Sequence, residues 1–303
     1  MFDEPINIDV HWNHGVSRRA SVKEPPIQVH QLGANIYILR QSKTLSHEAP
    51  FLYLMFGADR AVLWDTGATA DPALFPLRTT IDDLVERWLQ DHPHDSYELI
   101  VAHTHAHGDH VAADGQFADR PHTTVVGHEV EAVKAFFQIA DWPDGSGALD
   151  LGGGRVLHVL PIPGHHPASV AVYDPWSGIL LTGDTLYPGR LYVRDYPGFV
   201  QSLARLRDFV QDHPISAVLG CHIEMTTTPG RDYPLGATYQ PHEAPLALFP
   251  EHIDRVWQAS QQAATPGIHR FGEFFIVNGQ SARVVAALMV RGILWRIGYQ
   301  LKG

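Results

Sequence analysis

The feature that most constrains this chain is a dense cluster of metal-binding residue types directly after a short apolar segment. Residues 97–102 (YELIVA) predict a strand, and the chain continues at once as HTHAHGDH. Within six residues this stretch holds His105, His107, Asp109 and His110. Neutral imidazole and carboxylate groups are ligands for zinc, iron or manganese. A loop that leaves a strand can turn alternate side chains toward one point, so we predict a metal site there rather than a solvated His-rich turn.

Three later positions place further possible ligands directly after predicted apolar strands. They are His165 after Pro-Gly, Asp184 after Thr-Gly, and His222 after Gly-Cys. A single histidine or aspartate at a strand end is more often structural. Together with the first motif, these positions predict that several strand ends converge on one metal-binding edge.

Hydrophobic patterning predicts an α/β fold in which strands alternate with helices. The expected strands are 27–32, 35–39, 51–56, 60–64, 97–102, 123–126, 155–162, 169–173, 179–182 and 215–219. The expected helices are 79–91, 128–138, 199–210, 251–262 and one that begins at 281, with a hairpin around 270–277. This mixture predicts sheets that are covered by helices.

Composition and the lengths of the apolar segments argue against several classes of protein. The 303 residues carry a net charge of −11, which disfavours nucleic acid as a partner. Cys221 is the single cysteine, so no intrachain disulfide can form, and a reducing compartment is compatible. The first residues lack the apolar segment of a secretory signal, and Arg291 and Arg296 interrupt the longest apolar stretch. We therefore expect a cytoplasmic protein without stable membrane insertion.

These motifs resemble those of the metallo-β-lactamase superfamily over residues 27–222. The segment Leu63-Trp64-Asp65-Thr66-Gly67 also resembles that family's early strand and turn. The resemblance implies an αββα sandwich, with two mixed sheets flanked by helices and the metals at one edge. We expect a single domain over 1–303, with an N-terminal arm over 1–25 and a C-terminal extension over 223–303.

The resemblance also implies a ligand set for two divalent ions, with zinc expected and iron or manganese as alternatives. The ligands of the first metal would be His105, His107 and His165. Those of the second would be Asp109, His110 and His222, and Asp184 would bridge the two ions. Asp65 would not bind a metal itself but would orient one of the ligands. His166 also follows the Pro-Gly pair, and we prefer His165 as the ligand.

The activity implied is hydrolysis, with two ions activating a water for attack on an ester, thioester, lactone or amide carbonyl. Asp109 would orient the attacking water or shuttle its proton. Tyr187 would donate a hydrogen bond to the substrate carbonyl, and a packed aromatic residue after a turn is an equal alternative. The aspartate at 184 resembles the glyoxalase II and lactonase branches. The alternative is a mononuclear iron oxidoreductase that resembles persulfide dioxygenases.

Other residues are expected near the site with less defined roles. Tyr192, Arg190 and Arg194 follow Tyr187; an arginine suits a substrate carboxylate, but a surface position for them is slightly preferred. We expect residues 239–243 to form a structural loop, with capping of the pocket as the alternative. We expect the C-terminal helix to dock on the body or to form a homodimer contact, with contact to a membrane surface as the less favoured alternative. We expect a small-molecule substrate as partner.

Overall fold

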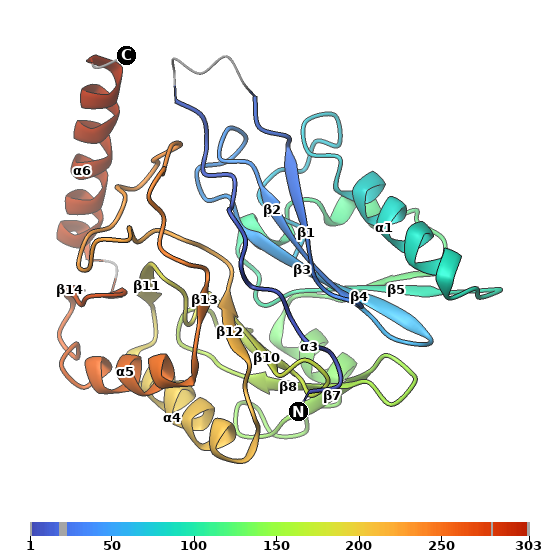
Figure 1. Ribbon diagram of the computed structural model, residues 1–303. Coiled ribbons are helices and arrows are strands. Elements are labelled where there is room, and N and C mark those ends of the chain that lie inside the picture. Colours follow the sequence, from blue (N-terminus) through green and yellow to red (C-terminus); the bar gives the residue numbers. More distant parts are fainter. Residues whose placement is uncertain (1, 18–22, 280, 302–303) are drawn as a thin grey trace.

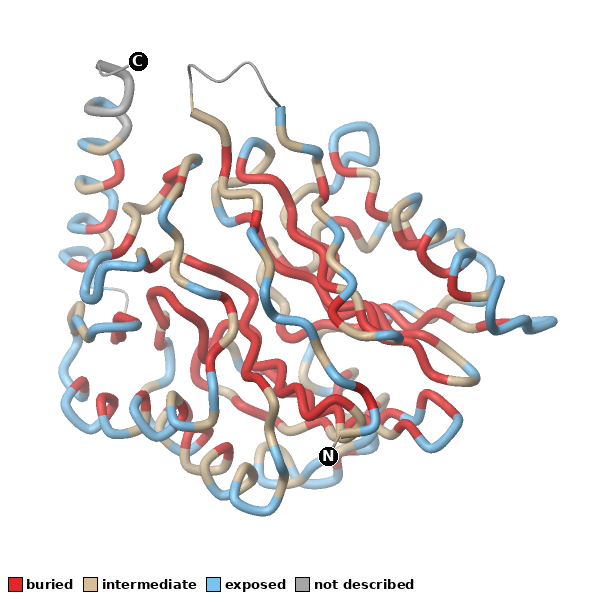
Figure 2. The backbone as a smooth tube through the Cα atoms, in the orientation of Figure 1, coloured by how far each residue is buried: buried red, intermediate tan, exposed pale blue. Residues whose placement is uncertain are grey.

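The computed structural model describes residues 2–17, 23–279 and 281–301, and it shows two six-stranded sheets packed face to face with helices outside (Figure 1). A shared core fills the space between the sheets and takes residues from both, such as Phe51, Trp64, Val172 and Leu181. Figure 2 shows this buried layer running through the middle of the molecule. The predicted αββα sandwich is confirmed.

The first sheet has the order β1–β2–β3–β4–β5–β6. Its strands are β1 (Ile27–Gly33), β2 (Ile36–Gln41), β3 (Phe51–Phe56), β4 (Arg60–Trp64), β5 (Glu98–Ala102) and β6 (Thr123–Val125). Strands β1 to β4 pair antiparallel, whereas β4, β5 and β6 pair parallel. The two parallel pairs bring the carboxyl ends of β4 and β5 to the same edge.

Strand β3 shows why this sheet is buried on both faces. Phe51 and Tyr53 point into the core between the sheets, whereas Leu52 and Leu54 join a second core under helix α1 (Leu77–Asp91). Successive side chains of a strand point to opposite faces, so a strand covered on both sides is apolar throughout. The short η1 helix (Asp114–Phe117) packs in the same outer layer.

The second sheet has the order β13–β12–β10–β9–β8–β7. Its strands are β7 (Gly147–Asp150), β8 (Val156–Pro161), β9 (Val170–Asp174), β10 (Ile179–Gly183), β12 (Ala217–Gly220) and β13 (Ala247–Leu248). Strands β10 and β12 pair parallel and the other pairs are antiparallel. Helices α4 (Tyr196–Asp212) and α5 (Pro250–Ser260) cover the outer face, and α3 (Val130–Phe137) packs into the central core.

A third, small sheet has the order β11–β15–β14 and leads into the C-terminal helix. Strand β11 (Arg190–Val193) pairs parallel with β15 (Phe275–Asn278), which forms the predicted hairpin with β14 (Gly267–Arg270). Helix α6 (Ala282–Leu301) then stands beside the loop of residues 226–245 (Figure 1). No helix among the described residues is long and apolar enough to cross a bilayer.

Candidate metal centre

Four chain segments deliver the predicted ligands to the edge where the two sheets meet. The motif of His105, His107, Asp109 and His110 follows β5, and the last two lie on the short helix α2 (Gly108–Val111). Asp184 follows β10 directly. Because β10 and β12 run parallel, His222 emerges beside Asp184 at the same sheet end.

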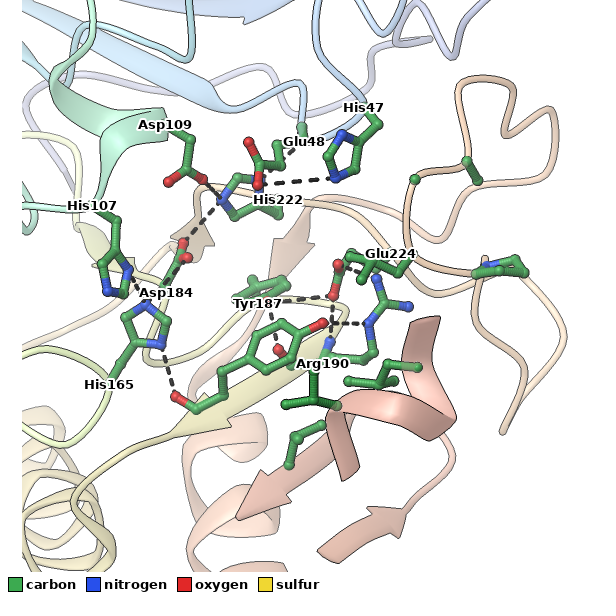
Figure 3. Close-up of a pocket in the computed structure, with 18 of the residues that line it drawn as sticks. His47, Glu48, His107, Asp109, His165, Asp184, Tyr187, Arg190, His222 and Glu224 are labelled. Atoms are coloured by element: carbon green, nitrogen blue, oxygen red, sulfur yellow. Dashed lines mark hydrogen bonds and ion pairs between the residues drawn. The ribbon is translucent and has the colours of Figure 1, made fainter. Parts of the chain in front are cut away.

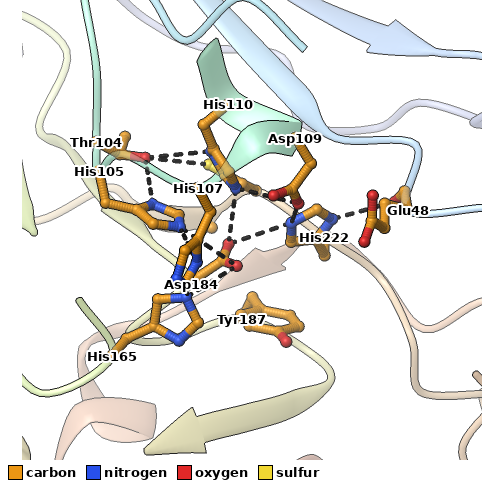
Figure 4. Close-up of polar contacts among 12 residues, drawn as sticks. Glu48, Thr104, His105, His107, Asp109, His110, His165, Asp184, Tyr187 and His222 are labelled. Atoms are coloured by element: carbon orange, nitrogen blue, oxygen red, sulfur yellow. Dashed lines mark hydrogen bonds and ion pairs between the residues drawn. The ribbon is translucent and has the colours of Figure 1, made fainter. Parts of the chain in front are cut away.

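The first group is a triangle of histidines. His105 Nε2 and His165 Nε2 each lie 2.9 Å from Nδ1 of His107 (Figure 4). Burial lowers the pKa of His105 well below its usual value, and it lowers that of His107 to about 4. Low pKa values keep these rings neutral near pH 7, which is the form that binds a metal.

The second group combines two carboxylates with two histidines. His222 Nε2 lies 3.3 Å from Asp109 Oδ2 and 3.3 Å from Asp184 Oδ1. His110 Nε2 lies 3.4 Å from the same Asp109 oxygen and 3.6 Å from the same Asp184 oxygen. Although burial opposes it, the carboxylates of Asp184 and Asp109 raise the pKa of His222 to about 10.

Asp184 lies between the two groups. Its Oδ1 faces His110 and His222, whereas its Oδ2 lies 3.6 Å from His165 Nε2 and 3.9 Å from His105 Nε2. One carboxylate therefore offers one oxygen to each group. This is the arrangement that a bridging ligand requires.

The donor set fits two metal ions. His110 Nε2 and Asp184 Oδ1 are buried and have no hydrogen-bond partner among the described residues. Buried polar atoms are usually satisfied, so unpaired atoms that face a common point indicate a missing partner. Three imidazole nitrogens at one point and a mixed imidazole–carboxylate group at the other are both donor sets that zinc accepts.

Partners behind the ligands fix their ring orientations. Asp65 Oδ2 lies 2.9 Å from His110 Nδ1, and Asp65 also accepts hydrogen bonds from the backbone and hydroxyl of Thr104. His165 Nδ1 contacts the backbone oxygen of Tyr192 at 2.7 Å, and His222 Nδ1 contacts that of Glu48 at 3.1 Å. In each case the nitrogen that faces away from the group is occupied, so the other is left for a metal.

The structure distinguishes His165 from its neighbour His166 as the ligand candidate after the Pro-Gly pair. His165 belongs to the first group, whereas His166 Nδ1 accepts a hydrogen bond from the backbone of Ala168. Cys221 is buried, and its thiol faces Asp65 at 3.4 Å. Burial raises the pKa of this thiol far above its usual value, which disfavours the thiolate.

The family model of the metallo-β-lactamase superfamily matches residues 48–222, more than half of the chain. The chain belongs to the metallo-β-lactamase superfamily. Relatives include a hydroxyacylglutathione hydrolase from Synechococcus sp. strain JA-2-3B'a(2-13), which is 32% identical over 52% of this chain and 58% of the relative. Another, from Anaeromyxobacter dehalogenans, is 29% identical over 54% of this chain and 60% of the relative. The chain thus spans less than two thirds of these relatives.

Solved structures of superfamily members share the fold. A metallo-β-lactamase from Erythrobacter litoralis covers 80% of this chain and 99% of its own, with 15% identity and a TM-score of 0.54. The metallo-β-lactamase FIM-1 from Pseudomonas aeruginosa covers 82% of this chain and 100% of its own, with 14% identity and a TM-score of 0.54. At such low identity, these similarities support the fold alone.

A pocket of about 330 Å³ opens onto the metal-ligand groups (Figure 3). His107, Asp109, His165, Asp184 and His222 form one wall. The remainder of its lining comes from segments that the metal motifs do not include. These are residues 47–48, 187–194, 224, 234–240, 277–279 and 284–289.

Tyr187 lines the pocket through its ring, and its hydroxyl is already engaged. The ring packs against His222 at 5.5 Å between centroids. The hydroxyl donates to the backbone oxygen of Arg190 and points away from both ligand groups (Figure 4). This placement disfavours the predicted hydrogen bond from Tyr187 to a substrate carbonyl, and it favours a packing role against His222.

The preferred surface position of Arg190 is wrong. Arg190 is 3% exposed, and its guanidinium pairs with Glu224 and, at 2.7 Å, with Asp232. Two carboxylates stabilise this buried cation, so it is not free for a substrate carboxylate. Tyr192 is half-buried and accepts a hydrogen bond from Arg190 Nε, whereas Arg194 is exposed at the pocket.

Several pocket residues were not predicted from sequence. Glu48 and Glu224 lie in loops without a ligand motif, and only their positions in the fold bring them to the pocket. Of the predicted capping residues 239–243, Gln240 lines the pocket, whereas Glu243 forms a two-point ion pair with Arg40. That loop therefore has a mainly structural role.

Proposed function

We propose that this protein is a metal-dependent hydrolase with a dinuclear, zinc-binding site that acts on an ester, thioester, lactone or amide carbonyl. One observation carries the proposal: Asp184 presents one carboxylate oxygen to each of two neighbouring ligand groups. His105, His107 and His165 would hold one ion, and Asp109, His110 and His222 the other. A mononuclear site has no need of the second group.

When bound, two such ions would lower the pKa of a water toward neutrality and polarise a carbonyl oxygen. The chain's own residues would position the attacking water and the substrate and exclude bulk water. Although burial opposes it, contact with His110 and His222 holds the pKa of Asp109 far below its usual value, so this residue stays a hydrogen-bond acceptor. Asp109 lines the pocket, where that acceptor can orient an attacking water.

The named relatives support a thioester as one substrate class. Both are called hydroxyacylglutathione hydrolases, and the match includes the ligand-bearing part of this chain. Their lengths are only partly covered, so we propose the reaction class and not the particular thioester. The same metal core serves many chemistries, and the pocket walls decide the substrate.

The test joins metal analysis to a panel of substrates. We expect two zinc ions per chain in the purified protein and turnover of at least one ester, thioester, lactone or amide. A single iron per chain, with oxygen uptake on a persulfide and no hydrolysis, would contradict the proposal. That outcome would indicate the mononuclear oxidoreductase alternative.

A further inference from the structure

We propose that helix α6 forms the wall of an acyl-binding pocket, and that the substrate carries an aliphatic acyl group packed against this helix. The inference rests on the proposed hydrolase function and adds the part of the substrate that the pocket selects. Figure 3 shows the metal ligands on one side of the pocket and the C-terminal segment with α6 on the other. The residues of α6 that line the pocket are Val284, Val285, Leu288 and Met289.

The apolar side continues beyond the helix. Leu235, from the loop beside α6, and Val277, from β15, line the same pocket. Val277, Val284 and Leu288 also form one small apolar cluster, with Leu235 packed against it. An apolar surface that faces a metal centre across a single cavity matches a molecule with a reactive carbonyl at one end and a hydrocarbon chain at the other.

A chain of ion pairs holds α6 in this position. Arg291 of α6 binds a carboxylate oxygen of Asp232 and, at 2.7 Å, its backbone oxygen. The other oxygen of Asp232 accepts a hydrogen bond from Arg190, which in turn binds Glu224. Glu224 follows the metal-ligand candidate His222 by two residues. The helix is thus tied to the segment that carries one side of the metal centre.

Close packing fixes the helix a second time. A Cβ atom at Gly292 would lie 2.4 Å from the backbone oxygen of Leu235, so only glycine allows α6 to approach the loop this closely. Glycine inside a helix has a stability cost relative to alanine. The contact at Gly292 offsets that cost and holds the apolar residues of α6 over the pocket.

Met289 and Val290 provide a matched test on one helix. Both side chains are 55% exposed, but Met289 lines the pocket and Val290 does not. The variants Met289→Gln and Val290→Gln introduce the same uncharged polar group at neighbouring positions. Each would be compared with the wild type on 4-nitrophenyl esters from acetate to octanoate.

We expect the wild-type kcat/KM to rise about two- to fourfold per added methylene, because a fully buried methylene contributes about 0.8 kcal/mol. Met289→Gln should lower kcat/KM for the octanoate about fivefold and leave the acetate within about twofold, since only the longer chain reaches α6. Val290→Gln should match the wild type on both esters.

A binding measurement separates this proposal from the proposed function. Butyrate and octanoate share a head group, so calorimetric titration of the metal-loaded protein with each isolates the effect of the chain. If no ester, thioester, lactone or amide of the substrate panel is hydrolysed but octanoate binds more tightly than butyrate, and Met289→Gln reduces that preference, the hydrolase proposal fails and the acyl pocket stands. Binding and turnover that do not depend on chain length, or equal effects of the two glutamine variants, would overturn the acyl pocket.

Discussion

The substitution Asp65→Asn tests how the protein prepares its metal ligands. Asp65 is fully buried, and its backbone has a φ of 68°, a conformation that asparagine also tolerates. Its Oδ2 faces His110 Nδ1 at 2.9 Å and accepts from the hydroxyl of Thr104 at 2.8 Å. A carboxylate can only accept, so it holds the ring proton on Nδ1 and leaves Nε2 of His110 free.

An amide nitrogen at the Oδ2 position would reverse this effect. It donates, so His110 would have to accept through Nδ1 and carry its proton on Nε2, the atom that faces Asp109 and Asp184. Loss of such a supporting partner typically costs about 10- to 100-fold in metal affinity, or about 1.4–2.7 kcal/mol. The lost charged hydrogen bond should also lower the free energy of unfolding by about 1–3 kcal/mol.

The assay is a competitive zinc titration against a chromophoric chelator, with metal content measured on the same samples. We expect Asp65→Asn to weaken one of two zinc sites and to leave the other near wild-type affinity. Asp174→Asn is the control: Asp174 is also fully buried but pairs with Arg155, so its loss should destabilise the fold and leave both zinc sites intact. Two sites of unchanged affinity in Asp65→Asn would refute the reasoning about His110.

Three further predictions follow from the same structure. His107→Ala removes the nitrogen that makes both close contacts of the first group, so metal content should fall to about one ion per chain or fewer and turnover should be lost. Wild-type metal content together with wild-type turnover would contradict this. Arg190→Met leaves the half-buried Glu224 without its ion-pair partner and leaves the buried Asp232 with Arg291 alone, so chemical denaturation should show a loss of up to about 3 kcal/mol. An unchanged unfolding curve would exclude a stabilising ion-pair network around Arg190. Burial lowers the pKa of Lys43 to about 8 from 10.5, so the unfolded state binds the proton more tightly. Between pH 8 and 10.5 the unfolding free energy of the wild type should therefore rise relative to that of Lys43→Met, by up to about 3 kcal/mol. A constant difference between the two proteins over this pH range would show that the pKa of Lys43 is not lowered.

The fold was predictable where local pattern and tertiary structure agree. Strands β3 and β4 have the predicted bounds because their apolar segments are bordered by turn residues. Strand β11 was missed because its stability comes from parallel pairing with β15, which lies far along the chain. No local sequence pattern predicts a pairing partner so distant along the chain.

The metal ligands were predictable for a different reason. Strand ends can be located from sequence, and the parallel pairing of β10 and β12 brings Asp184 and His222 to one edge of the second sheet. His105 follows β5 of the first sheet and approaches Asp184 because the two sheets pack face to face. The hydroxyl direction of Tyr187 and the burial of Arg190 were not predictable. The Tyr187 hydroxyl is directed by the backbone oxygen of Arg190, and Arg190 is buried by its pairing with Glu224 and Asp232; none of these contacts follows from sequence spacing.

The central claim is that two ions lie side by side at this sheet edge with Asp184 between them. Anomalous diffraction at the zinc edge, from crystals grown with zinc, tests it most directly. We predict two peaks per chain, one bounded by His105, His107 and His165 and the other by Asp109 and the two remaining histidine ligands, with one Asp184 oxygen on each. A single peak, or peaks away from these residues, would contradict it.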